Sequence, residues 1–88
     1  MLSRLLAKLF KAKGKRVVIE VLYARDTGQL LLHIQRGDQH YILRVDDLRV
    51  RYWLAVGWLY DKCQAGIVPI PAYEQTTAML TALLNSVA

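Results

Sequence analysis

Cysteine and serine are scarce in this chain, and the usual motifs of nucleophilic and metal sites are missing. Cys63 is the only cysteine, so no disulfide can form within the chain, and a reducing compartment is expected. The only serines, Ser3 and Ser86, lie near the ends, and no GxSxG, phosphate-loop or zinc-finger spacing occurs. These absences argue against an enzyme. The sequence predicts no catalytic residues, no metal, no cofactor and no small-molecule substrate.

Long uncharged apolar runs are also missing. No stretch reaches the length of a transmembrane helix without charge. Arg4 and Lys8 interrupt the first apolar segment, and no small-residue cleavage site follows it, so a secretory signal is not expected. We therefore expect a cytoplasmic protein, and any membrane attachment would be peripheral.

The size and the apolar content of the chain fit a single small domain with surface to spare. A chain of 88 residues buries roughly 60–65% of its unfolded surface. Its apolar fraction of 55% exceeds the roughly 45–50% that is typical of globular domains. Such an excess indicates either a very full core or a face that a partner or a second copy covers.

The positive charge is confined to one end of the chain. The net charge is +5, from twelve Lys and Arg against seven Asp and Glu, and residues 1–16 hold six of the cations and none of the acids. The remaining residues are therefore close to neutral. The candidate contacts for an anionic partner are Arg4, Lys8, Lys11, Lys13, Lys15 and Arg16.

The same basic segment has apolar residues at helical spacing. The apolar positions are Leu2, Leu5, Leu6, Leu9 and Phe10, which predict a basic amphipathic helix within residues 1–16 that ends at Gly14. Three roles are open for such a helix. It would cover the core of its own domain, lie on an anionic membrane, or form an arm that binds nucleic acid.

Residues 17–45 alternate as three β-strands, with turns at RDTG and RGDQ. Hairpin geometry predicts the register of an antiparallel meander, in which Val21 lies opposite Leu32 and Leu32 opposite Leu43 on the core face. The opposite face is only half apolar, so we expect something to cover it. That face holds Val18, Glu20, Leu22, Leu31, His33, Gln35, His40, Ile42 and Arg44.

Residues 46–66 admit two interpretations. The segment LRVRY alternates like a fourth strand over residues 48–54, but that strand would place Arg49 opposite Arg44. As a helix, the segment has Asp46 or Asp47 as its N-cap and Gly66 at its end. We favour the helix. It is apolar over most of its circumference, so we expect a central helix between the sheet and another layer.

A last helix is expected over residues 71–87, with Pro71 in its first turn. No charged residue follows Glu74, so this helix is predicted to be packed or bound to a partner. The predicted fold is therefore a single α+β domain, αβββαα. It has an N-terminal amphipathic helix, a three-stranded antiparallel meander and two helices packed on one face of the sheet.

Two side-chain clusters could carry function. His33 and His40 lie near Asp38 and Glu20, which suggests a metal or acid–base site, but no motif-like third ligand exists and we favour a cross-strand Glu–His pair. Tryptophan, tyrosine and arginine at residues 49–60 are typical of core, of protein hot spots or of base stacking. The candidate interaction surface is Leu22, Leu31, His33, Ile42, Arg44, Arg49, Arg51, Trp53 and Trp58.

The sequence does not specify a particular activity. We expect a small non-enzymatic protein-interaction module, such as an adaptor, an inhibitor or a regulatory subunit, that self-associates as a homodimer through its apolar second face. The alternatives are a nucleic-acid-associated protein that uses residues 1–16 and a peripheral membrane protein anchored by its N-terminal helix.

Overall fold

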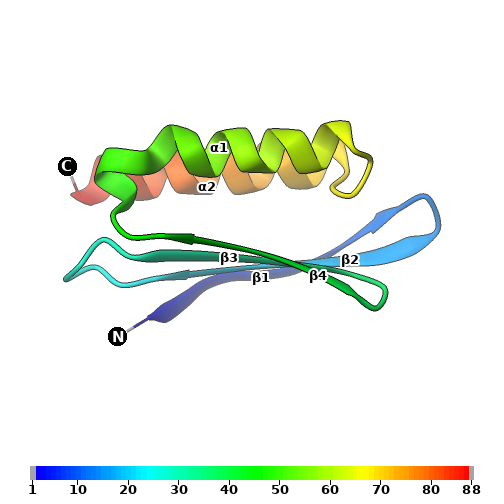
Figure 1. The fold of residues 1–88 in the computed structure, drawn as a ribbon, viewed down its shortest axis with the longest axis horizontal. Helices are drawn as coiled ribbons and strands as arrows, with labels where there is room; N and C mark the ends of the chain where they lie inside the picture. The colour runs from blue at the N-terminus through cyan, green and yellow to red at the C-terminus, as the bar shows by residue number, and fades with distance from the viewer. Residues whose placement is uncertain (1, 88) are drawn as a thin grey trace.

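A four-stranded antiparallel sheet forms one layer of the protein and two helices form the other (Figure 1). This arrangement is seen in the computed structural model, which describes residues 2–87. The strands follow one another across the sheet in chain order, so the sheet is a simple meander. The elements are β1 (Ser3–Ala12), β2 (Lys15–Tyr23), β3 (Leu30–Arg36), β4 (Gln39–Val45), α1 (Leu48–Gln64) and α2 (Ile70–Val87).

The predicted N-terminal helix is wrong, and the fold is ββββαα rather than αβββαα. Within this segment, residues 3–16 supply β1, a tight turn and the start of β2. The turn residues Lys13 and Gly14 have φ values of 52° and 77°. Positive φ at both central positions is the geometry of the two-residue turn that matches strand twist. Gly14 therefore joins two strands and does not end a helix.

The apolar residues of β1 fit a strand as well as a helix, which explains the error. Leu6, Phe10 and Ala12 share the core face with Lys8, whose ammonium reaches across to the Gln75 side chain at 2.6 Å. A bulge between Arg4 and Leu6 shifts the register, so Leu5 and Leu6 do not alternate. An isolated helix of this length is marginal in water, whereas pairing with β2 satisfies the backbone along the whole strand.

The predicted register of the other three strands is confirmed. Val21 pairs with Leu32 and Leu32 with Leu43, as the hairpin lengths require. The second turn uses Gly37 with φ of 60°, as predicted for the RGDQ segment. Val17, Ile19, Val21, Leu32 and Ile34 are fully buried beneath the helices.

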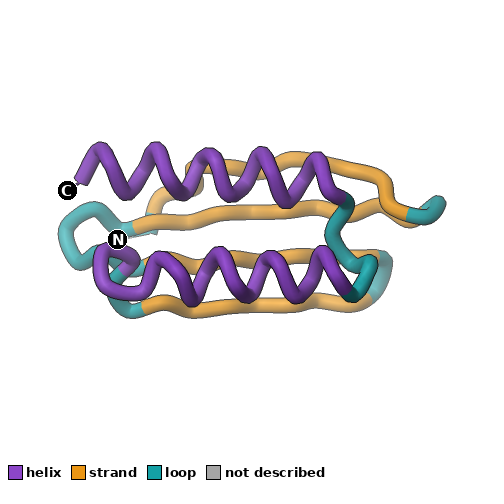
Figure 2. Tube along the Cα trace, turned by 90° about the horizontal axis from the view of Figure 1, so that it is seen from above, coloured by secondary structure: helices purple, strands orange, loops and turns teal. Residues whose placement is uncertain are grey.

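Residues 48–54 form a helix, so the fourth-strand alternative for this segment is wrong. Asp47 is the N-cap of α1 and accepts a hydrogen bond from the backbone N–H of Arg49. The expectation of a central helix between two layers is also wrong. In the view from above, α1 lies beside α2 over β3 and β4, and α2 lies over β1 and β2 (Figure 2). The helical layer therefore has an outer surface that no other element covers.

The core lies between the sheet and this single helical layer. Leu48, Ala55 and Leu59 of α1 and Ala72, Thr76 and Leu80 of α2 are fully buried. Cys63 is half-buried and free, so it lies at the margin of the core rather than inside it. The position of the core determines which side chains remain available on the two outer surfaces.

The buried Thr76 hydroxyl has no hydrogen-bond partner among residues 2–87. We expect Thr76→Val, which replaces the hydroxyl with a methyl group of similar size, to stabilise the fold by about 1 kcal/mol, or roughly 4–8 °C in Tm. Thr81→Val is the matched control, because the Thr81 hydroxyl donates to the Thr77 carbonyl at 2.9 Å and also contacts the Tyr52 hydroxyl. Thermal unfolding of both variants measures the difference. Equal effects of the two substitutions would contradict the assignment.

Candidate interaction surfaces

The nine residues predicted to form one interaction surface lie on opposite sides of the molecule. Leu22, Leu31, His33, Ile42 and Arg44 lie on the sheet face that points away from the helices, here called the outer sheet face. Arg49, Arg51, Trp53 and Trp58 belong to α1 in the other layer. The residues selected from the sequence therefore belong to two separate surfaces, one on each layer, and do not form a single contact face.

A chain of polar side chains crosses the outer sheet face from one edge strand to the other. Arg4 of β1 forms an ion pair with Glu20 of β2 at 3.0 Å. The other oxygen of Glu20 lies 3.1 Å from His33 Nδ1 on β3, and His33 Nε2 lies 2.8 Å from His40 Nδ1 on β4. The expected Glu–His pair thus exists, and it is part of a row of four partners defined here as the polar row. Each member of the polar row already has a partner within the chain.

Apolar side chains lie on both sides of the polar row. Leu22 and Leu31 pair across β2 and β3 on one side, and Leu9 pairs with Val18 on the other. Leu9 is 46% exposed and Ile42 is 54% exposed. A sheet face that meets only water normally alternates to polar residues. The outer sheet face is therefore more apolar than a sheet face that meets only water, and no element among residues 2–87 covers it.

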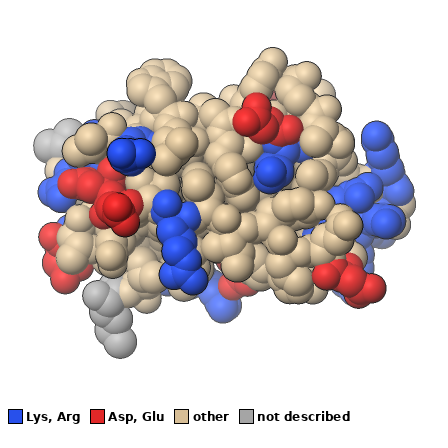
Figure 3. Space-filling view, viewed as in Figure 1, with Lys and Arg blue, Asp and Glu red and all other residues tan. Residues whose placement is uncertain are grey.

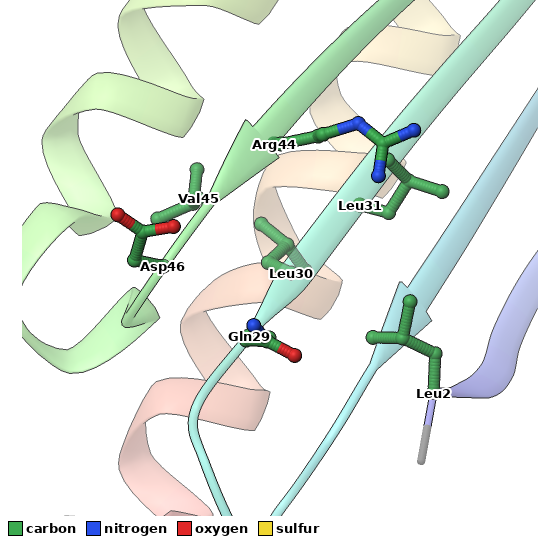
Figure 4. Close-up of a pocket in the computed structure, with 7 residues that line it drawn as sticks. All are labelled: Leu2, Gln29, Leu30, Leu31, Arg44, Val45 and Asp46. Atoms are coloured by element: carbon green, nitrogen blue, oxygen red, sulfur yellow. The ribbon is translucent and has the colours of Figure 1, made fainter.

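A small notch lies at one end of the outer sheet face (Figure 4). Leu2, Leu31 and Arg44 line it, together with Asp46 on the connection to α1. Its volume of about 110 Å³ is below the roughly 300 Å³ at which ligand pockets usually begin. We regard this notch as part of the rim of the face.

The second surface is a stripe of exposed apolar residues along α1. Val50 is 79% exposed and Trp53 is 77% exposed, and Leu54 and Tyr60 are 43% and 51% exposed. Together with Gly57, these four residues are called the α1 stripe. Trp53, Leu54, Gly57 and Tyr60 occupy one side of the helix, and Val50 lies just before Arg51, whose φ of −118° and ψ of 31° interrupt the helix. The surface over α1 is mostly uncharged in Figure 3. Exposed Trp and Tyr are typical of protein contact surfaces.

Most of the α1 stripe lies outside the interaction surface predicted from the sequence. That prediction included Trp53 but not Val50, Leu54, Gly57 or Tyr60, because a helix that is apolar all round was assigned to the interior. Trp58 was named, but it is half-buried and lies beneath the Lys62 ammonium, which is 5.2 Å from its ring centroid. Trp58 therefore belongs to the edge of the core.

Arg49, another predicted contact, has a structural role. Its Nε and Nη2 atoms both lie 2.9 Å from the carboxylate oxygens of Asp47. The hydrogen bonds from Arg49 lower the pKa of Asp47 below its ordinary value of 3.8. Asp47 also packs against Gly28, where an added Cβ would lie 2.5 Å from its Oδ1 atom. The Arg49–Asp47 pair thus fixes the corner between the sheet and α1.

The six predicted cations of the N-terminal segment divide into two groups. Arg4 and Lys8 are engaged with Glu20 and Gln75. The other four gather at the end of the β1–β2 hairpin, at the right of Figure 3, and form no ion pair within the described chain. These hairpin-tip cations are Lys11, Lys13, Lys15 and Arg16.

The remaining predictions concern metal binding, the two histidines and membrane-spanning helices. Among residues 2–87, no three His, Cys, Asp or Glu side chains are grouped so as to hold a metal ion. His33 and His40 point their ring nitrogens at each other, and the rings are within 2° of parallel. Over the same residues, neither helix has the length and apolar content needed to cross a bilayer.

No protein-family model matches the chain, and neither the curated proteins nor the solved structures searched contain a match.

The corner between the sheet and α1 gives a pH-dependent prediction. Since the pKa of folded Asp47 is lowered, its charge stabilises the fold above pH 3.8, and that contribution is lost as the pH falls through the lowered value. Asp47→Asn keeps a capping side chain but removes the charge. We expect its Tm to be below that of the wild type at pH 7 and to converge with it in strong acid.

Asp47→Ala is the control for this prediction. Alanine removes the cap as well as the charge, so this variant should stay less stable than the wild type at every pH. Thermal unfolding followed by circular dichroism from pH 2 to pH 7 measures both differences. A gap between wild type and Asp47→Asn that does not change with pH would contradict the role given to Arg49.

Proposed function

We propose that this protein is a small non-enzymatic interaction module that self-associates through its outer sheet face. The observation that carries the proposal is the composition of that face. Its strands are apolar on both sides of an internally satisfied polar row, and no helix among residues 2–87 covers them. Association through this face would remove its apolar side chains from water.

The occupant that the face fits best is a second copy of itself. Val18 and Leu22 stand on either side of Glu20 along β2, so a twofold axis across the strands near Glu20 brings Leu22 of each copy to Val18 of the other. The same rotation places Arg44 of β4 over His40 of the other copy, and Asp38 of the β3–β4 turn lies two residues beyond His40. Neither Arg44 nor Asp38 has an ion-pair partner within the described chain.

The polar row does not prevent burial of this face. Buried polar groups are costly chiefly when they lack hydrogen-bond partners. Glu20 pairs with Arg4 and His33, and His33 in turn contacts His40. The side chains of the polar row therefore already have partners within the chain before the face is buried. The polar row also gives the interface a fixed polar centre between two apolar regions, which favours one register over others.

Ile42 is the most exposed large apolar residue of the outer sheet face, and it provides the test. We expect Ile42→Glu to weaken self-association by about 100-fold or more, because an unpaired charge buried at an interface costs several kcal/mol. Light scattering after size exclusion should show that the number of copies per particle is halved.

Ile42→Val is the matched control, since it keeps a β-branched apolar side chain at the same position. It should keep the wild-type particle mass. Circular dichroism of Ile42→Glu should remain that of a folded chain, because the side chain points away from the core. A wild-type mass for folded Ile42→Glu would rule out the outer sheet face as the contact.

The hairpin-tip cations favour a second function, which is the binding of nucleic-acid backbones. The four cations gather at the end of the β1–β2 hairpin without ion-pair partners among residues 2–87, and no acidic residue lies among residues 11–16 to offset them. The Lys13 ammonium lies against Gly66, where an added Cβ would be 3.0 Å from it. Phosphate contacts of this kind attract nucleic acid without reading its sequence. The charge predicted for an N-terminal helical arm thus lies instead on a rigid hairpin.

Salt dependence tests this second function. We expect Lys11→Gln, Lys15→Gln and Arg16→Gln together to reduce the slope of log K against log salt for a short DNA duplex by about 3, at roughly one counterion per phosphate contact. Fluorescence anisotropy with a labelled duplex measures the slope. Lys8→Gln, Arg25→Gln and Lys62→Gln remove the same charge away from the tip and from both proposed contacts, and an equal loss in that control would contradict a tip-specific site.

A further inference from the structure

Gly57 is an exception among the glycines of this chain, because nothing within the chain requires it. Gly14, Gly28, Gly37 and Gly66 all have positive φ, whereas Gly57 lies in the middle of α1 and is absent from that group. A Cβ added at Gly57 would meet no atom within 4 Å. Glycine in a helix interior lowers stability relative to alanine. Neither backbone conformation nor internal packing therefore accounts for a glycine at this position.

The surroundings of Gly57 form a shallow apolar hollow. Its walls are Trp53, Leu54, Trp58, Tyr60 and Asp61, and Gly57 forms its floor. Val50 and Trp53 lie toward the start of the α1 stripe and Tyr60 toward its end, so the stripe extends to both sides of the glycine. A missing side chain at the centre of an apolar stripe lets another backbone approach closely, as small residues do where helices cross.

We infer that Gly57 is the crossing point of two α1 helices, in a symmetric antiparallel pair formed with a second copy of this chain. Successive residues of a helix are rotated by about 100°. With a twofold axis at Gly57, Trp53 of one copy lies beside Tyr60 of the other, and Leu54 of one copy enters the hollow beside Trp58 of the other. The aromatic pair and the filled hollow remove Trp53, Leu54 and Tyr60, which are all exposed in the single chain, from water.

The charged residues next to the α1 stripe favour a second copy of the chain, rather than an unrelated apolar protein, as the partner of α1. Arg51 and Asp61 are both exposed, and neither forms an ion pair among residues 2–87. They are ten residues apart, or about 15 Å along a helix, so they cannot pair within one chain. The backbone at Arg51 is irregular, with φ of −118° and ψ of 31°, and Asp61 lies in the regular part of α1. In the antiparallel pair, Arg51 of each copy lies on the same side of the crossing as Asp61 of the other. The charges of Arg51 and Asp61 on one α1 helix are therefore complementary to those on a second α1 helix in the antiparallel pair.

This contact is independent of the outer sheet face, because the two surfaces belong to opposite layers (Figure 1). A chain with two separate self-complementary faces forms particles larger than a dimer, either as a closed tetramer or as an open array. Removing either face should leave dimers that are held by the other face. Removing both should leave monomers of 10.1 kDa.

Gly57→Leu tests the crossing, with particle mass by light scattering as the readout. Leucine is a better helix former than glycine, so the variant should keep or gain helical circular dichroism, while its side chain fills the hollow and separates the helices. We expect the number of copies to be halved, and Ile42→Glu with Gly57→Leu to give the monomer. An unchanged or larger particle would overturn the inference, because added apolar surface would then promote contact.

A charge exchange provides a second test that misfolding cannot imitate. Arg51→Asp alone and Asp61→Arg alone should each weaken association at low salt by roughly tenfold, because each places like charges together across the crossing. The double variant with both reversals should recover the wild-type mass. Failure of the double reversal to recover it would overturn the antiparallel pairing, even if the outer sheet face were confirmed by Ile42→Glu. A wild-type mass for Ile42→Glu beside a working charge exchange would leave the crossing in place and reject the sheet contact.

Discussion

The packing of one helical layer against one face of the sheet is the interaction on which the rest of this structure depends. It buries Ile19, Leu32 and Ile34 of the sheet with Leu48 and Leu59 of α1. Two layers enclose a single core, so each layer must present its other face to the outside. In a chain that is 55% apolar, this core cannot contain all the apolar side chains. Much of the exposed remainder lies on the outer sheet face and along the α1 stripe, and Ile70 at the start of α2 is an exception.

The two outer surfaces differ in where their polar groups lie. The outer sheet face places its polar groups in a bonded row across the strands, where Arg4 and Glu20 lie 3.0 Å apart. The α1 stripe has no charged residue at its centre, and the charged residues Arg51 and Asp61 lie next to its two ends. The outer sheet face is therefore suited to fixing the register of a contact, and the α1 stripe is suited to the close approach of another helix. Together they account for an apolar content that the core alone does not explain.

The sequence predicted the central part of the fold correctly because each local signal there agreed with the tertiary structure. The register of Val21 with Leu32 follows from turn length and alternation, and Asp47 is an N-cap by residue type and position. The strand at residues 3–12 was missed because Leu6 and Phe10 satisfy both a helical and a strand period. Only pairing with β2, which is a non-local contact, decides between the two. The exposure of Trp53 was missed for a related reason, since the number of layers is not encoded in the pattern of one helix.

The central claim of this account is that both outer surfaces are contacts between copies of the chain. The most direct test is the particle mass of the wild-type protein, measured by light scattering across a wide concentration range. The account predicts a mass that is a multiple of 10.1 kDa and rises beyond that of a dimer with concentration. A mass of 10.1 kDa at every concentration would contradict it.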